Sequence, residues 1–336
     1  MTRASAAGPD FRNERRRVVI DTDAANEIDD QFAIVWALLA SEHLDVVAIH
    51  AAPYAHGPYL AALRRAIAER GDGPRTGFEE LANGLTEEQL QRSLEHEPVA
   101  AGMERSFDEI VRIVDAVAPS DRPTLRRGAT RLMTDVREPV GSEAVDNLIA
   151  LAHGSDDPLY VAVLGAPTNV ASALVTDPTI ADKIVIVFVA GYPTASPHVD
   201  DSFNLVQDLV ATNRIFAPDT RLVYIPGHQV AVTLSVSLPE LLAHAHGPIG
   251  ELLIDLYLSN PLAAAPTTPG HSWVMWDLAP IAWLIDPTWI ATFETAGAQL
   301  TTAHRWNPGA GRITEAYRVD RRAVYIDLFD RLASAP

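Results

Sequence analysis

The sequence predicts an α/β protein with a mainly parallel, doubly wound (Rossmann-like) sheet that helices cover on both faces. Three observations predict this class. Short apolar runs rich in β-branched residues alternate along the chain with segments of helical spacing. These runs are continuously apolar, as in strands buried on both faces. The chain has 336 residues, 48% of them hydrophobic, which is enough for a large core.

The first strands and the first helix are predicted close to the start of the chain. Residues 18–20 (VVI) form a β-branched run that ends at Asp21 and predicts a buried strand. From Asp30 onward, apolar residues recur at helical spacing, and residues 45–52 (DVVAIHAA) predict a second buried strand.

The same alternation continues in the middle of the chain. Strands are predicted at 158–165, 183–191 and 221–226, and helices at 169–174 and 208–216. In open sheets of this kind, ligands lie outside the carboxyl ends of the strands. Such ends are occupied by Asp21, His50, Gly165 and Gly191. We therefore expect these residues to converge.

The domain organisation is predicted to be simple. Residues 1–16 form a polar leader, and 17–336 form a single α/β domain. Residues 79–97 are acidic and polar and are interpreted as an insertion, in which Thr86 and Gln89 have the spacing of a capping box. Near the end, 312–319 and 323–328 are predicted to be a terminal hairpin or edge strands.

Composition excludes several classes of function. The formal net charge of -18 argues against nucleic acid or an anionic membrane as partner, while it suits a divalent cation and a neutral nucleoside or sugar. The absence of cysteine excludes disulfides, thiolate metal sites and cysteine nucleophiles. No signal peptide and no apolar run of about 18 residues is found, so a cytoplasmic location is expected.

The segment 18–33, VVIDTDAANEIDDQFA, carries the main chemical signal. Asp21 and Asp23 alternate at a strand end, and Asp29 and Asp30 follow at a helix start. The alternative is that the second pair only caps the helix. Four carboxylates at one turn repel one another, however, and a calcium ion takes about six to eight such oxygens. A second signal is Asp277, which precedes the apolar run 278–285 that predicts a buried helix.

Four motifs occur in an order that resembles the inosine–uridine-preferring nucleoside hydrolases: 18–33, LGAPTNVASAL (164–174), SFNLVQD (202–208) and WDLAPIAWLIDP (276–287). The resemblance covers most of residues 17–290. It implies calcium-dependent hydrolysis of ribonucleosides to ribose and free base, by attack of a water held at the metal, and a homo-oligomer (dimer or tetramer).

The resemblance also implies roles for individual residues. Asp23 would be general base and metal ligand, together with Asp30, Asp277 and the carbonyl of Leu164. Asp29 and Asn204 would bind the ribose, and Asp21 would support the cluster.

Three of the chain's departures from the usual pattern of this family fall on candidate site residues. Its opening turn, 24–28, is two residues longer, which resembles a divergent branch with the pattern DTDxxNEIDD and brings Asn26 or Glu27 near the site, unless they are solvated turn residues. His50 stands where many relatives place a sugar-binding asparagine and could replace it in binding the substrate, unless it is only a packed or hydrogen-bonded histidine. Trp276 replaces a histidine that is a candidate acid for the leaving base; it can stack on a base but cannot protonate it.

Two other functions are compatible with parts of the pattern. A ribose- or nucleoside-binding protein that kept the metal site but lost turnover would explain Trp276, whereas Asp23 argues for catalysis. A magnesium phosphohydrolase would also use a DxD motif such as Asp21 and Asp23 after its first strand, but the lysine and the later acidic pair that it needs are not found.

Overall fold

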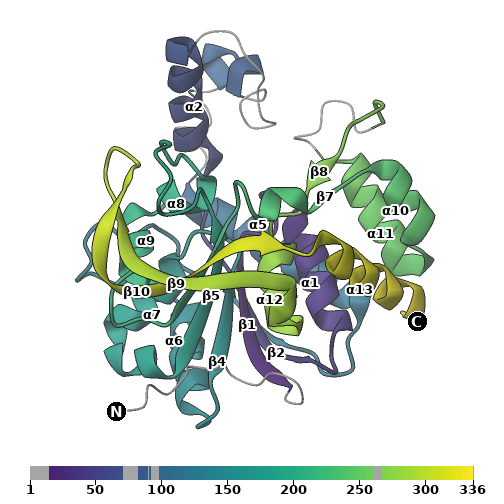
Figure 1. Ribbon diagram of the computed structural model, residues 1–336, viewed down its shortest axis with the longest axis horizontal. Coiled ribbons are helices and arrows are strands. Elements are labelled where there is room, and N and C mark those ends of the chain that lie inside the picture. Colours follow the sequence, from purple (N-terminus) through teal and green to yellow (C-terminus); the bar gives the residue numbers. More distant parts are fainter. Residues whose placement is uncertain (1–14, 71–81, 90, 92–97, 261–266, 336) are drawn as a thin grey trace.

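The computed structural model describes residues 15–70, 82–89, 91, 98–260 and 267–335, and an eight-stranded sheet runs through its centre (Figure 1). The strand order is β3-β2-β1-β4-β5-β6-β10-β9. The strands are β1 (Arg16–Thr22), β2 (Leu44–Ala51), β3 (Thr124–Arg126), β4 (Leu159–Val163), β5 (Ile184–Ala190), β6 (Leu222–Pro226), β9 (Ile290–Leu300) and β10 (Trp306–Val319). All neighbours pair in parallel except β9 and β10, which are antiparallel.

The order of the strands reverses between β1 and β4. From β1 the chain continues outward to β2 and β3, and it then returns to the other side of β1 to form β4, β5 and β6. Ligands of doubly wound sheets bind at such a switch point, outside the carboxyl ends of the strands. The carboxyl ends of β1 and β4 are therefore the expected position of the site.

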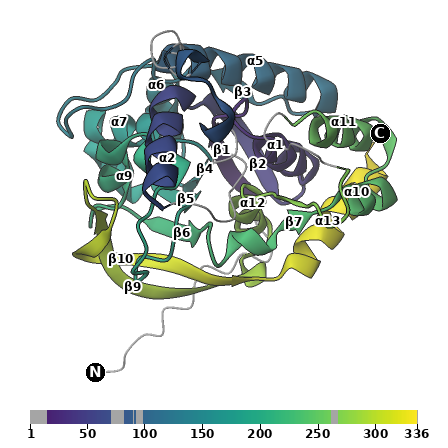
Figure 2. The same ribbon diagram turned by 90° about the horizontal axis from the view of Figure 1, so that it is seen from above.

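Two separate hydrophobic clusters cover the two faces of the sheet. One contains side chains of α1 (Asp29–Leu39), α5 (Val99–Val117), α12 (Leu278–Ile285) and α13 (Arg321–Ser334). The other contains side chains of α6 (Glu143–His153), α7 (Thr168–Thr176) and α9 (Leu209–Ile215). Figure 2 shows α7 and α9 on one side of the sheet and α1 and α12 on the other. The predicted doubly wound α/β class is confirmed.

The five strands predicted in the first two thirds of the chain are confirmed as β1, β2, β4, β5 and β6, and the helices as α1, α7, α9 and α12. The strand predicted at 323–328 is wrong, because these residues lie within α13. The side chain of Asp320 accepts a hydrogen bond from the backbone N–H of Ala323 and so caps this helix. The strand β10 instead forms its hairpin with β9, which the sequence did not predict.

The capping box in the predicted insertion is confirmed. The N–H of Thr86 donates to Oε1 of Gln89 (2.8 Å), and the N–H of Gln89 donates to Oγ1 of Thr86 (3.1 Å). Residues 79–81, 90 and 92–97 of that segment, and 1–14 of the predicted leader, lie outside the described residues.

The remaining elements lie around the carboxyl edge of the sheet or at its side. Helix α2 (His56–Arg70) projects from the body at the top of Figure 1. The short helix α8 (Phe203–Val206) follows β5, and β7 (Ser235–Val236) pairs with β8 (Trp273–Val274) beside α10 (Leu238–His244) and α11 (Gly247–Leu258). In the described part of the chain, no helix has the length and apolar character needed to cross a bilayer.

Candidate active site

The opening motif folds as a turn between β1 and α1, and its four aspartates are buried. The cap position of α1 is Ile28, which makes no side-chain cap. Asp29 and Asp30 therefore occupy the first two positions of the helix instead of capping it. Their negative charge there is favoured by the helix dipole, but the dipole alone does not explain why both are buried.

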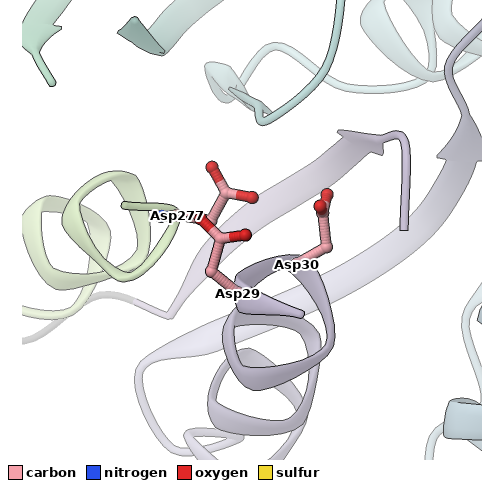
Figure 3. A group of neighbouring side chains, drawn as sticks. All are labelled: Asp29, Asp30 and Asp277. Carbon is pink, nitrogen blue, oxygen red and sulfur yellow. Dashed lines mark hydrogen bonds between the residues drawn. The ribbon is translucent and has the colours of Figure 1, made fainter. Parts of the chain in front are cut away.

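Three carboxylates meet at the starts of α1 and α12. Asp29, Asp30 and Asp277 each offer an oxygen, and these oxygens lie within 4.8 Å of one another. Figure 3 shows the side chains extending from the two helix starts into the same space. Two ligands on opposite sides of a calcium ion are about 5 Å apart, because each calcium–oxygen distance is about 2.3–2.6 Å. The spacing of the three carboxylates therefore fits one such ion.

Burial without a compensating cation shifts the proton affinity of these acids. Burial, followed by the charges of neighbouring carboxylates, raises the pKa of Asp23, Asp30 and Asp277 well above the ordinary value. Burial raises the pKa of Asp21 and of Asp29 to about 7. A divalent cation would favour the ionised forms and offset both the burial and the repulsion.

Several oxygens near the cluster are buried without a hydrogen-bond partner among the described residues. They are both carboxylate oxygens of Asp23, Oδ1 of Asp29 and Oδ1 of Asn204. An unsatisfied buried acceptor costs about 1–3 kcal/mol, and more when it is charged. The donor set is made of oxygen alone, which is what calcium and magnesium require. The residues present therefore fit a hard divalent cation.

Neutral side chains hold two of the aspartates in place. The hydroxyl of Thr22 donates to Oδ1 of Asp30. The amide of Asn169 donates to Oδ1 of Asp21 (2.8 Å) and to the carbonyl of Ala51 (3.1 Å). Neither donor was predicted as part of the site. Thr22 could have been found from its place between Asp21 and Asp23, and Asn169 from its place at the start of a helix after a strand end.

A close backbone approach joins β4 to the opening turn. A Cβ atom at Gly165 would lie 2.8 Å from Cβ of Ala52 and 3.1 Å from the backbone nitrogen of Asp23. Glycine is therefore required for the chain to pass this closely behind Asp23.

The predicted carbonyl ligand and the predicted ribose-binding amide meet directly. The amide nitrogen of Asn204, on α8, donates to the carbonyl of Leu164 (2.5 Å). The N–H of Leu164 in turn donates to the carbonyl of Asp21 (2.8 Å), which anchors the end of β4 to β1. Asn204 thus lies at the switch point, at the carboxyl ends of β1 and β4.

His50 and Asn26 make contacts with other parts of the chain. His50 is fully buried, and its Nε2 bonds to Oδ1 of Asn147 on α6 (2.9 Å). Burial lowers the pKa of His50 to about 4. Oδ1 of Asn26 bonds to Nε2 of His56 at the start of α2 (2.7 Å). Glu27 is half-buried, and burial, followed by the charges of Asp29 and Asp30, raises its pKa well above the ordinary value.

Comparison with known proteins identifies the family. A family model described as inosine-uridine preferring nucleoside hydrolase matches residues 18–325. A search of curated protein sequences finds no match.

Among solved structures, the chain is similar to a plant nucleoside hydrolase (18% identity, TM-score 0.65, 96% of this chain and 100% of that one). It is also similar to a purine-preferring ribonucleoside hydrolase from Gardnerella vaginalis (16% identity, TM-score 0.67, 95% and 99%). A third similar structure is an inosine-uridine preferring nucleoside hydrolase from Bacillus anthracis (15% identity, TM-score 0.59, 96% and 100%).

Proposed function

Because the chain belongs to the inosine-uridine preferring nucleoside hydrolase family and is thereby a ribonucleoside hydrolase, we propose that it cleaves the N-glycosidic bond of ribonucleosides in a calcium-dependent reaction with Asp23 as general base. One observation supports this proposal above the others. Buried aspartate oxygens without partners, at the switch point of the sheet, lie beside three carboxylates that fit one divalent cation.

The residues that would hold the ion are Asp30, Asp277, Asp23 and the carbonyl of Leu164. Asp30 and Asp277 belong to the three-carboxylate cluster, whose third member, Asp29, would instead bind the ribose. Asp23 is not a member of that cluster and would complete the ligand set from the opening turn. The carbonyl of Leu164 accepts the amide of Asn204, so a small rotation of that amide would free it for the ion. When bound, calcium would supply the positive charge that lowers the pKa of a water at this site.

Asp23 has the properties that a general base needs. Its two oxygens are buried and have no partner among the described residues, so one of them can accept a proton from the attacking water. The oxygen of that water forms a bond to the anomeric carbon of ribose, while the bond from that carbon to the base nitrogen breaks. The ribose passes through a state with oxocarbenium character, which nearby carboxylates stabilise.

In this proposal, Asp29 and Asn204 position the sugar. Asp29 uses Oδ2 to accept the N–H of Asp277, and its Oδ1 has no partner among the described residues. Oδ1 of Asn204 is also buried and has no partner among the described residues. These two oxygens can accept hydrogen bonds from the ribose hydroxyls, which would fix the anomeric carbon beside the water and raise its effective concentration.

Release of free ribose tests the proposed function. Purified protein is incubated with a panel of purine and pyrimidine ribonucleosides, with calcium, with a chelator, and with the chelator followed by excess calcium. We expect ribose release with calcium, loss on chelation and recovery on readdition. Binding of nucleosides without ribose in a single-turnover experiment would instead identify a binding protein. Phosphate release from phosphoesters with magnesium would identify a phosphohydrolase.

A further inference from the structure

Three partly exposed rings form a row beside the carboxylate cluster, and none of them has a role in the proposed function. Tyr192 follows β5, His228 follows β6, and Trp276 precedes α12. The rings of Tyr192 and His228 are stacked, with centroids 4.3 Å apart and an interplanar angle of 30°. The rings of His228 and Trp276 form an edge-to-face pair, with centroids 5.6 Å apart and an interplanar angle of 74°.

The backbone fixes the position of His228. Ala190 and Pro226 are paired at the carboxyl ends of β5 and β6. Beyond this pair, the N–H of Gly227 donates to the carbonyl of Ala190 (3.0 Å), and the N–H of His228 donates to that of Gly191 (2.8 Å). The imidazole is therefore carried on an extension of the sheet, which is a rigid support.

The row of rings leads directly to the acid cluster. Trp276 is the residue before Asp277, and the N–H of Asp277 donates to the carboxylate of Asp29. A Cβ atom at Gly227 would lie 3.5 Å from the indole of Trp276, so this backbone packs against the ring. His228 is thus in direct ring contact with Trp276, the residue next to Asp277.

The chemistry of the proposed reaction needs a proton at this place. When the N-glycosidic bond breaks, the electron pair stays on the base nitrogen, and the base leaves as an anion unless an acid protonates it. Asp23 receives a proton from water and cannot supply the first one to the base. The indole of Trp276 is no acid, whereas an imidazolium is.

We propose that His228 is the catalytic acid that protonates the leaving base. In this arrangement Trp276 and Tyr192 keep the base and the imidazole of His228 in contact. The proposal rests on the proposed function. The proton passes from the imidazolium of His228 to a ring nitrogen of the base as the glycosidic bond breaks. The water proton passes to Asp23, and exchange with solvent restores both residues, so that ribose and neutral base are formed.

Two properties of the site suit this role. His228 is half-buried, so it can contact both a substrate and solvent. Burial, followed by the nearby His198, lowers the pKa of His228, which makes the imidazolium a stronger proton donor while it reduces the protonated fraction at neutral pH.

The test compares two substrates that differ in how much their leaving group needs a proton. The hypoxanthine base of inosine is a poor leaving group when it departs as an anion, whereas 4-nitrophenyl riboside releases a stable phenolate. We expect His228→Gln to lower kcat/KM for inosine by about 10²- to 10⁴-fold and to leave kcat/KM for the nitrophenyl riboside nearly unchanged. The matched control is His198→Gln. His198 is exposed and also contacts Tyr192, with centroids 5.0 Å apart, and this variant should keep both activities.

Three results would overturn the assignment: equal losses on both substrates, which indicate a structural role; no loss on either; and a selective loss in His198→Gln, which transfers the acid role to that residue. Quenching of tryptophan fluorescence by free hypoxanthine gives a second measurement, and His228→Gln should bind this product more weakly. If wild-type protein cleaves neither riboside, the proposed function itself fails, which is distinct from all three results.

Discussion

The backbone N–H of Asp277 donates a hydrogen bond to Oδ2 of Asp29, with a nitrogen–oxygen distance of 3.3 Å. This bond joins the first residue of α1 to the residue that precedes α12. Asp277 makes no side-chain cap on its own helix. Its carboxylate is therefore available to the acid cluster, while its backbone fixes the neighbouring carboxylate. The two helix starts are held together by a contact between the candidate site residues themselves.

Replacing Asp23 with Asn should abolish hydrolysis. The loss of a general base alone lowers a rate by about 10²- to 10⁴-fold, and the loss of a metal ligand adds to it. The measurement is kcat by ribose release at saturating calcium. Calcium binding by calorimetry and the melting temperature serve as controls for folding. Turnover close to that of the wild type in the calcium-loaded variant would contradict the proposed role.

Calcium should stabilise the protein more at pH 8 than at pH 5. Because burial raises the pKa of Asp21 and Asp29 to about 7, the unfolded chain loses these protons at lower pH than the folded one. Stability of the calcium-free protein should therefore fall as the pH rises from the ordinary carboxyl pKa toward 7. Calcium at about 100 times its Kd should restore about 2.7 kcal/mol.

The variant Asp30→Asn sharpens this experiment. It removes one buried charge from the cluster, so the melting temperature without calcium at pH 8 should stay equal or rise, while the calcium-induced increase should largely disappear. The matched control is Asp108→Asn, at an exposed position of α5, which should keep the full calcium response. A full calcium response in Asp30→Asn would show that the ion is held elsewhere.

Asn204→Ala should weaken the binding of ribose without weakening the binding of the metal. The variant loses one sugar contact and the donor to the Leu164 carbonyl. A lost hydrogen bond of this kind corresponds to about 10- to 100-fold in kcat/KM. Calorimetry should give a calcium Kd like that of the wild type. A large drop in calcium affinity would assign Asn204 to the metal instead of to the sugar.

Trp276→Ala should weaken the binding of the base. Stacking of a base on an aromatic ring contributes about 1–3 kcal/mol, so KM for a nucleoside should rise by about 5- to 150-fold. Trp276→Phe keeps a stacking face and should retain most of the affinity. Inhibition by free ribose should be the same in all three proteins. An unchanged KM in Trp276→Ala would mean that the base lies elsewhere.

The buried His50 should make the protein sensitive to acid. Because burial lowers its pKa to about 4, the unfolded chain takes up this proton first as the pH falls below the ordinary value of about 6.5. Stability should therefore be lost as the pH falls from about 6.5 to 4, by roughly 3 kcal/mol. The measurement is the difference in unfolding free energy between wild type and His50→Asn at several pH values. A difference that does not change with pH would contradict this account.

The carboxyl edge of the sheet could be predicted as the place of the site because the strands are continuous apolar runs with clear ends, whereas the strand order, and with it the switch point, came only from the structure. Asp21 and Gly165 each stand at the end of such a run, and in a parallel sheet the carboxyl ends of neighbouring strands lie at the same edge. The helix α12 was predictable for a similar reason, since its eight residues, Leu278–Ile285, are all buried.

Two features could not be predicted: contacts between residues far apart in the sequence, and the choice between strand and helix where the apolar residues fit both periods. The amide of Asn169 reaches Asp21 across 148 residues of sequence, and no local pattern indicates that partner. In 323–328, alternation of Val324, Ile326 and Leu328 favoured a strand, although Ile326 is 44% exposed in the helix. Val324 and Leu328 also have helical spacing, and the cap at Asp320 decides between the two periods.

The long separation between Asp29 and Asp277 has a consequence for biosynthesis. The two residues are 248 positions apart, and all the strands from β1 to β6 are made between the start of the chain and α12. A nascent chain therefore lacks an essential part of the acid cluster until late in translation. Cation binding at this site can then lock in a nearly finished sheet, but it cannot guide the first steps of its assembly.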